Sequence, residues 1–282
     1  MIEINNIYQG DCYELIKEIP DKSIDLIYTD VPYDFSNYGN GGGCFGVENR
    51  PYQKEMNVDK KTTYKKLAEK EYELYKNNSD SVEAEKHRQE YNRLTLKTDT
   101  VDIDSGIDFS IYDEFCRIMK EIYIYIWLSK KQIPYTIDYF VNEKKCNFEI
   151  LTWHKTNPIP KTNNVWLSDT EYCLFFREKN AHKLNDGFNL KHKYYISSTN
   201  KDDKEKYKHP TIKPLEMVEN HILHATKEGD TVLDCFAGSG TTLVACRDTK
   251  RNYIGFELDE TYYKIAKDRL NNVDAKGNIS LF

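Results

Sequence analysis

The sequence predicts an α/β fold built on an open, mostly parallel sheet, and three stretches predict it. Residues 1–33 have the pattern of a strand, a helix and a second strand, which is the unit that joins parallel strands. Residues 231–257 repeat that order, with a glycine-rich turn after the first strand. Residues 122–128 form a continuous β-rich run, which is typical of a strand buried on both faces of a sheet.

The composition is that of an ordinary soluble globular protein, with 39% hydrophobic and 30% charged residues. The 282 residues are enough for one large α/β domain or two small ones. No apolar run approaches the roughly 20 residues that a membrane span needs, and the N-terminus lacks a signal-peptide pattern. A net charge of −6 argues against a protein that coats nucleic acid indiscriminately, although a local basic surface can still bind DNA.

The seven cysteines are scattered along the chain, and none forms a C-x-x-C pair. This pattern indicates neither a zinc site nor a disulfide framework. We therefore expect no metal and a reducing, cytoplasmic setting.

The second predicted strand begins near Ile24 and ends in Asp30-Val31-Pro32-Tyr33. Pro32 has no N–H group, so we expect the strand to stop there. The Val31 carbonyl is then expected to lack a partner in the sheet. The result is a carboxylate, a free carbonyl and an aromatic ring at the carboxyl end of a strand, which is where open α/β sheets bind ligands.

Two unusual segments follow this strand. Residues 34–46 are rich in glycine and indicate a flexible loop over the presumed site, either a lid or a substrate loop. Residues 48–98 are dominated by lysine and glutamate, which predicts one or two exposed helices. These helices are either a solvated insertion or a surface that contacts DNA or a partner.

The middle of the chain continues the alternation of helices and strands. Helical spacing predicts helices over residues 111–119 and 133–140, and apolar runs predict strands over 148–153 and 172–176. Between those two strands lies a polar loop, residues 154–160, with two prolines.

Residues 177–208 carry nine basic against five acidic side chains, a local charge of +4 in a chain of net −6. Aromatic, histidine and asparagine residues are interspersed. This stretch is the strongest electrostatic candidate for a polyanion site, and a lysine-bearing surface loop is the plain structural alternative.

The stretch 231–257 has the features of a nucleoside-binding unit. Glycines in the turn after the first strand let a ligand approach the backbone, and Glu257 ends the second strand, where an acid accepts hydrogen bonds from ribose hydroxyls. The turn is Ala-Gly-Ser-Gly rather than G-x-G-x-x-G, which disfavours NAD. A small-residue turn that only packs a helix on a strand is the structural alternative.

Two motifs together resemble a known family. Asp234–Thr242 resembles the S-adenosylmethionine motif of amino-group DNA methyltransferases, and Asp30–Tyr33 resembles their catalytic tetrapeptide, normally Asp-Pro-Pro-Tyr. The catalytic motif comes first, which is the order of the β group, a circular permutation of the methyltransferase fold. Supporting matches are Gly10–Cys12, Trp153–Pro160, Glu171-Tyr172 and His209–Pro214.

The resemblance implies a Rossmann-like methyltransferase fold with a seven-stranded, mostly parallel sheet and helices on both faces. It implies a catalytic domain of residues 1–47, 99–177 and 209–282, a helical insertion at 48–98, and a target-recognition region at 178–208. The implied partner is double-stranded DNA, with a homodimer and a cognate restriction endonuclease as further partners. The implied setting is the cytoplasm of a bacterium or archaeon, or a phage-encoded protein.

The resemblance also assigns residue roles. The catalytic residues would be Asp30, Val31, Pro32 and Tyr33. S-adenosylmethionine would be held by Asp11, Cys12, Asp30, Thr211, Lys213, Asp234, Phe236, Ala237, Gly238, Ser239, Gly240, Thr241, Thr242, Glu257 and Leu258. The flipped base and DNA would contact Phe35, Trp153, Lys155, Asn157, Pro158, Lys191, Lys193 and Tyr194.

The expected reaction is methylation of the N6 amino group of a flipped-out adenine. The Asp30 carboxylate and the Val31 carbonyl would accept both N–H groups, and Tyr33 would stack on the base. An N4-cytosine enzyme, an RNA target and a catalytically silent module that binds DNA and cofactor remain as alternatives. Valine in place of the usual proline is the one departure from the catalytic motif, and we expect it to leave an active enzyme.

Overall fold

A computed structural model describes residues 2–33, 107–158, 166–182, 184–185, 191–199 and 212–271, with residues 70, 73–74, 76–77, 83, 87 and 207. The chain divides into two compact units, one of residues 1–31 with 110–282 and one of residues 32–109. The described residues between 70 and 87 are helical. The second unit is wider than the expected insertion at 48–98.

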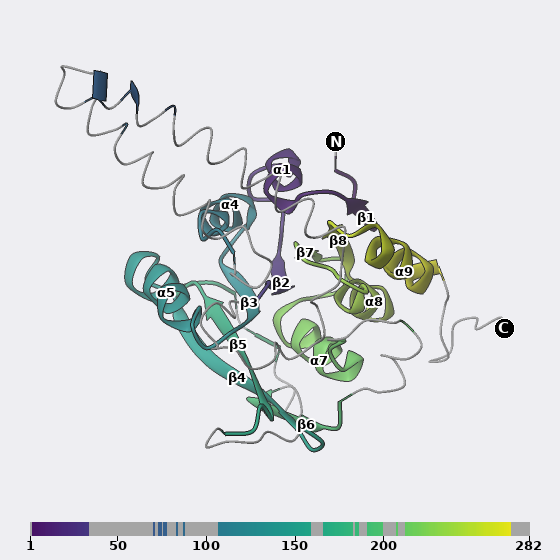
Figure 1. Ribbon diagram of the computed structural model, residues 1–282. Coiled ribbons are helices and arrows are strands. Elements are labelled where there is room, and N and C mark those ends of the chain that lie inside the picture. Colours follow the sequence, from purple (N-terminus) through teal and green to yellow (C-terminus); the bar gives the residue numbers. More distant parts are fainter. Residues whose placement is uncertain are drawn as a thin grey trace. The chain divides into compact units, whose positions relative to one another are not determined.

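The first unit contains an eight-stranded sheet with the order β1-β8-β7-β2-β3-β5-β4-β6 (Figure 1). Its strands are β1 (Asn6–Gln9), β2 (Leu26–Asp30), β3 (Tyr123–Leu128), β4 (Asn147–Lys155), β5 (Thr170–Arg177), β6 (Tyr194–Ser197), β7 (Thr231–Asp234) and β8 (Asn252–Glu257). Of these strands, β5 alone is antiparallel to its neighbours. The predicted Rossmann-like fold is confirmed, with β6 as a strand beyond the seven expected.

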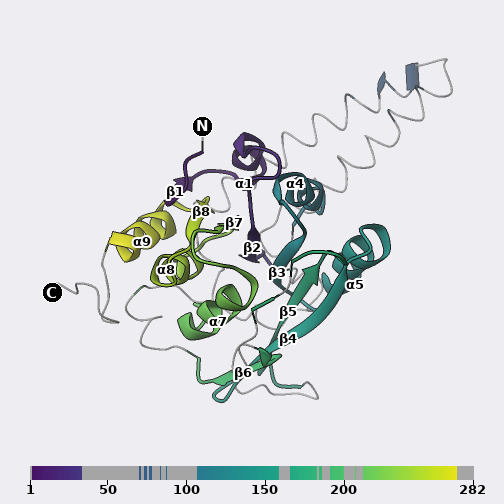
Figure 2. The same cartoon turned by 180° about the vertical axis from the view of Figure 1, so that it is seen from behind.

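Helices cover both faces of the sheet. They are α1 (Cys12–Leu15), α4 (Ile111–Ile118), α5 (Ile133–Ile137), α7 (Leu215–Ala225), α8 (Thr241–Asp248) and α9 (Glu260–Asn271), with short helical turns at Ile16–Glu18 and Asp138–Glu143. Both views place α7, α8 and α9 on one face and α1, α4 and α5 on the other (Figure 1 and Figure 2). Among the described residues, no helix is long and apolar enough to cross a membrane.

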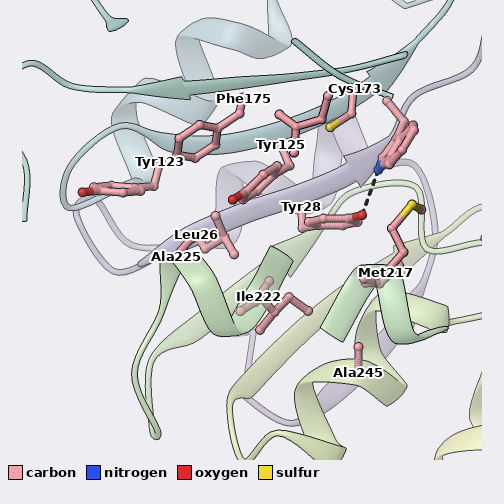
Figure 3. Close-up of a cluster of buried hydrophobic side chains, with 14 of the residues drawn as sticks. Leu26, Tyr28, Tyr123, Tyr125, Cys173, Phe175, Met217, Ile222, Ala225 and Ala245 are labelled. Atoms are coloured by element: carbon pink, nitrogen blue, oxygen red, sulfur yellow. Dashed lines mark hydrogen bonds between the residues drawn. The ribbon is translucent and has the colours of Figure 1, made fainter. Parts of the chain in front are cut away.

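The core under α7 is unusually aromatic. Tyr28 of β2, Tyr125 of β3 and Phe175 of β5 lie side by side across the sheet (Figure 3). The Trp127 indole N–H donates to the Tyr28 hydroxyl at 2.8 Å, and that hydroxyl lies 3.2 Å from His221 Nδ1. Burial lowers the pKa of His221 to about 3, so the ring is neutral and acts as a packing partner.

Candidate active site

The carboxyl ends of four neighbouring parallel strands bring four predicted site residues to one edge of the sheet. Asp30 ends β2, Asp234 ends β7, Glu257 ends β8, and Asp11 follows β1. The registers align these ends, since Gln9 pairs with Glu257 and Asp234 pairs with Gly255. From β7 the chain continues to β8 on one side, and from β2 it continues to β3 on the other side. The carboxyl ends of β7 and β2 therefore form the switch point at which open α/β sheets bind ligands.

Asp30 is held by a largely buried chain of alternating charges. Lys213 Nζ lies 2.5 Å from Asp30 Oδ2 and 2.9 Å from Glu171 Oε2, and Lys155 Nζ pairs with the other oxygen of Glu171. Although burial would lower the pKa of Lys213, the two carboxylates raise it above its usual value. Burial opposes the charge of Glu171, but Lys213 and Lys155 hold its pKa at about 2. This arrangement keeps Lys213 cationic and fixes the Asp30 carboxylate.

Val31 extends the contact between β2 and β3. Its N–H donates to the Trp127 carbonyl at 3.1 Å, and its side chain is buried. A proline at this position would lack that N–H. Among the described residues, none donates a hydrogen bond to the Val31 carbonyl.

The glycine-rich turn between β7 and α8 is tightly held. Gly238 and Gly240 have φ values of 53° and 79°, which glycine adopts without strain. A Cβ atom at Gly240 would lie 2.8 Å from the Cβ of Ala266, so α9 packs directly on the turn. The Arg269 guanidinium donates to the Ser239 carbonyl at 2.7 Å and to Thr241 Oγ1 at 3.1 Å. The backbone of the turn is therefore preorganised.

Asp234 links this turn to the strand that carries Asp30. Its Oδ1 accepts hydrogen bonds from Thr29 Oγ1 at 2.9 Å and from the Phe236 N–H at 3.1 Å. Burial raises the pKa of Asp234 to about 6. The side chain thus joins β2 to the start of the turn.

Glu257 has the properties of an acceptor for hydroxyl groups. One carboxylate oxygen accepts from the Gly238 N–H at 2.7 Å and the other from the Asp259 N–H at 2.8 Å. Burial, partly offset by these two bonds, raises the pKa of Glu257 to about 7. Each oxygen can accept a second hydrogen bond, so a ribose diol fits the carboxylate.

Other residues expected near the cofactor are placed as follows. Asp11 caps α1, accepting from the Tyr13 N–H at 3.0 Å, and Cys12 behind it is buried. Leu258 is exposed just after β8. Thr211 lies outside the described residues, as does Phe35 from the base-contacting set.

The residues expected at the base and DNA fall into three environments. Trp153 is 2% exposed and packs in the core, with its N–H on Ser197 Oγ at 2.9 Å, so the structure does not present its ring as a wall for a base. Lys155 belongs to the charge chain of Asp30. Tyr194 and Lys193 are exposed on and beside β6, while Asn157, Pro158 and Lys191 lie in the polar segments around β4 and β6.

Sequence reasoning missed several residues that shape the site. Glu171 entered only in the supporting match Glu171-Tyr172, and its ion pairs reach Lys155 and Lys213, which lie 16 and 42 positions away in the chain. Arg269 was not singled out, and an arginine in an amphipathic helix gives no sign of an inward role. Burial of these charges was the missing information.

The comparisons agree with this geometry. A family model described as DNA methylase, for the N6 and N4 methyltransferases, matches residues 24–268. Type II methyltransferase M2.LlaDCHI of Lactococcus lactis subsp. cremoris and M2.DpnII of Streptococcus pneumoniae are each 28% identical to the chain. Both matches cover 94% of this chain and 88% of the relative.

Solved structures share the fold. The M1.HpyAVI–SAM complex has a TM-score of 0.56 at 24% identity, with 94% of this chain and 98% of the other covered. The PvuII cytosine-N4-specific DNA methyltransferase has a TM-score of 0.58 at 16% identity, with 99% and 89% covered. Since the family model matches most of the sequence, this chain belongs to the N6/N4 DNA methylases, the S-adenosylmethionine-dependent methyltransferases of DNA amino groups.

Proposed function

We propose that this methyltransferase modifies the N6 amino group of an adenine flipped out of duplex DNA. The observation that carries the proposal is the combination of the Asp30 carboxylate with the Val31 carbonyl at the end of β2. The neighbouring strand, β7, leads into the glycine-rich turn. An aspartate as the first residue of the tetrapeptide favours adenine, because serine is associated with the cytosine enzymes of the family.

The two acceptors address the main chemical difficulty of the reaction. The lone pair of an exocyclic amino nitrogen is delocalised into the ring, so the nitrogen is a weak nucleophile. Asp30 and Val31 would accept hydrogen bonds from both of its N–H groups and so localise the lone pair on nitrogen. Lys213 orients the Asp30 carboxylate through the 2.5 Å ion pair, so the acceptor is positioned before the base arrives.

S-adenosylmethionine, when bound, supplies an electrophilic methyl group. The glycine turn from Phe236 to Thr242 would hold its methionine part, and Glu257 would accept from its ribose hydroxyls. Asp11 and Cys12 would meet the adenine, with Asp30, Thr211, Lys213, Asp234 and Leu258 around the pocket. The raised pKa of Glu257 supports this role, since a carboxylate kept partly dry gains more from hydroxyl donors than an exposed one.

Target recognition is proposed for residues 178–208, with Lys191, Lys193 and Tyr194 among the DNA contacts and Tyr33 stacked on the base. The exposed Tyr194 ring and Lys193 ammonium support this part. A homodimer, a cognate restriction endonuclease and a cytoplasmic setting remain predictions; the relatives above are named Type II methyltransferases.

Mass spectrometry of nucleosides tests the proposal. The protein is incubated with S-adenosylmethionine and genomic DNA from a methylation-deficient strain, and the DNA is then digested. N6-methyladenine is the expected product. N4-methylcytosine would support the alternative base. The absence of both products would contradict the proposal. A parallel reaction with RNA tests the choice of nucleic acid.

A further inference from the structure

The carbonyl of Val31 stays available only if the sheet does not use it. Asp30 pairs with Trp127 in the parallel register of β2 and β3, and the Val31 N–H donates to the Trp127 carbonyl. In a parallel ladder the next bond would run from the Ser129 N–H back to the Val31 carbonyl. Pro32 does not prevent this bond, because proline removes only its own N–H.

That next bond is replaced by a side chain. The Ser129 N–H donates to Gln132 Oε1 at 2.9 Å, and the Gln132 N–H donates to the Ser129 carbonyl at 3.0 Å. Gln132 therefore satisfies both backbone groups of the residue that would otherwise continue the ladder. Ser129 and Gln132 are both buried, so water is a poor substitute for either bond.

Thr136 fixes the position of the Gln132 backbone. The backbone carbonyl of Gln132 accepts from Thr136 Oγ1 at 2.8 Å and from the Thr136 N–H at 3.1 Å. Thr136 Oγ1 lies 2.9 Å from the Tyr112 hydroxyl. The backbone of Gln132 thus belongs to a buried network that joins α5 to α4, and its side chain reaches from this fixed backbone to the residue after β3.

We propose that Gln132 is a positioning residue for methyl transfer: its amide oxygen holds the Ser129 N–H away from the Val31 carbonyl, which leaves that carbonyl to accept the substrate amino group. Without this acceptor, the buried Ser129 N–H would turn to the Val31 carbonyl, the nearest group that the register offers. This inference rests on the proposed function, since it assigns the partner of the same carbonyl.

Three variants separate positioning from stability. Gln132→Met keeps the size but removes the acceptor, and Gln132→Glu keeps the shape and the acceptor. Thr136→Val is the control, because it removes buried hydrogen bonds behind Gln132 without touching Ser129. Each variant is assayed for tritiated methyl transfer to genomic DNA from a methylation-deficient strain, for S-adenosylmethionine affinity and for Tm.

For Gln132→Met we expect kcat to fall on the order of 100-fold, the lower end of the range for losing one preorganised hydrogen-bonding group, with S-adenosylmethionine affinity unchanged. Gln132→Glu should retain most of kcat. Thr136→Val should lower Tm and leave kcat unchanged.

Wild-type kcat in Gln132→Met would overturn the inference, and so would an equal kcat loss in Gln132→Glu or Thr136→Val. In each of these cases the wild-type enzyme still transfers methyl groups, so the proposed function stands. A wild-type protein that transfers no methyl group to any base would overturn both.

Discussion

At the scale of single residues, the site combines a charged acceptor held by an ion pair with a neutral acceptor held by the sheet. Lys213 fixes the Asp30 carboxylate, and the Val31 N–H, in the peptide group just before the acceptor carbonyl, donates to the Trp127 carbonyl. Both acceptors are therefore positioned next to contacts made within the protein. Such preorganisation is the main way a protein assists a reaction that needs no strong base.

Replacement of Val31 by proline tests how the neutral acceptor is held. Val31→Pro removes the N–H donated to Trp127, so stability should fall by about 1 kcal/mol, partly recovered by the stiffer unfolded chain. The carbonyl remains, and kcat should stay close to wild type. Urea unfolding and the methyl-transfer assay measure the two effects. A kcat loss of roughly tenfold, about 1.4 kcal/mol in the barrier, would show that the N–H bond is needed for catalysis.

The pKa of Glu257 gives a pH dependence to cofactor affinity. With a pKa of about 7, the side chain is largely neutral at pH 6 and charged at pH 8. A charged carboxylate accepts more strongly from hydroxyls, so S-adenosylmethionine should bind more tightly as pH rises through 7. Calorimetry from pH 5.5 to 8.5 measures this, and Glu257→Gln should flatten the profile. An unchanged slope in Glu257→Gln would place the titrating group elsewhere.

At the scale of elements, one charge chain ties together segments that no local pattern connects. Lys155 ends β4, Glu171 lies near the start of β5, and Lys213 precedes α7. Lys155 pairs with Glu171, Glu171 pairs with Lys213, and Lys213 pairs with Asp30 at the end of β2. The antiparallel β5 makes this possible, because its N-terminal end lies at the edge where its neighbours have their carboxyl ends.

Removal of the Glu171 carboxylate should destabilise the folded protein. Glu171→Gln leaves Lys155 and Lys213 buried with less compensation, which should lower the free energy of unfolding by about 3 kcal/mol. The folded pKa of about 2 lies below the ordinary 4.5, so this contribution is present above pH 4.5 and is lost as pH falls toward 2. Urea unfolding at pH 7 and pH 3 measures both effects.

The exposed pair of Lys193 and Glu149 provides the control for this prediction. Both side chains are more than half exposed, so Glu149→Gln should change stability by no more than roughly 0.5 kcal/mol. If Glu171→Gln changed the free energy of unfolding as little as Glu149→Gln, the charge chain would not be a stabilising feature.

The elements themselves were largely predictable, and their partners were not. Apolar runs predicted β3, β4 and β5 to within about two residues, because burial on both faces leaves an unbroken hydrophobic signal. The short β6 was hidden in a polar stretch, since Tyr194 and Ile196 are exposed. Trp153 was placed at the base because aromatic residues serve both cores and stacking sites, and sequence alone does not separate the two.

At the scale of the whole first unit, the order of strands brings together motifs from opposite ends of the chain. The β2 and β7 strands are neighbours, and Thr29 donates to Asp234 across 205 positions of sequence. Motif order and family resemblance predicted this meeting. The ion pair of Lys213 with Asp30 was not predicted, because a pairing of distant charges leaves no periodic signal.

The central claim is that Asp30 and Val31 direct methyl transfer to an adenine amino group in DNA. Long-read sequencing of DNA from cells that express the wild-type chain, or its Asp30→Ala variant, tests this claim most directly. We predict N6-methyladenine at one recurrent sequence with the wild-type chain and none with Asp30→Ala, while purified Asp30→Ala still binds S-adenosylmethionine. An unmethylated genome with the wild-type chain, or an equally methylated one with Asp30→Ala, would contradict the account.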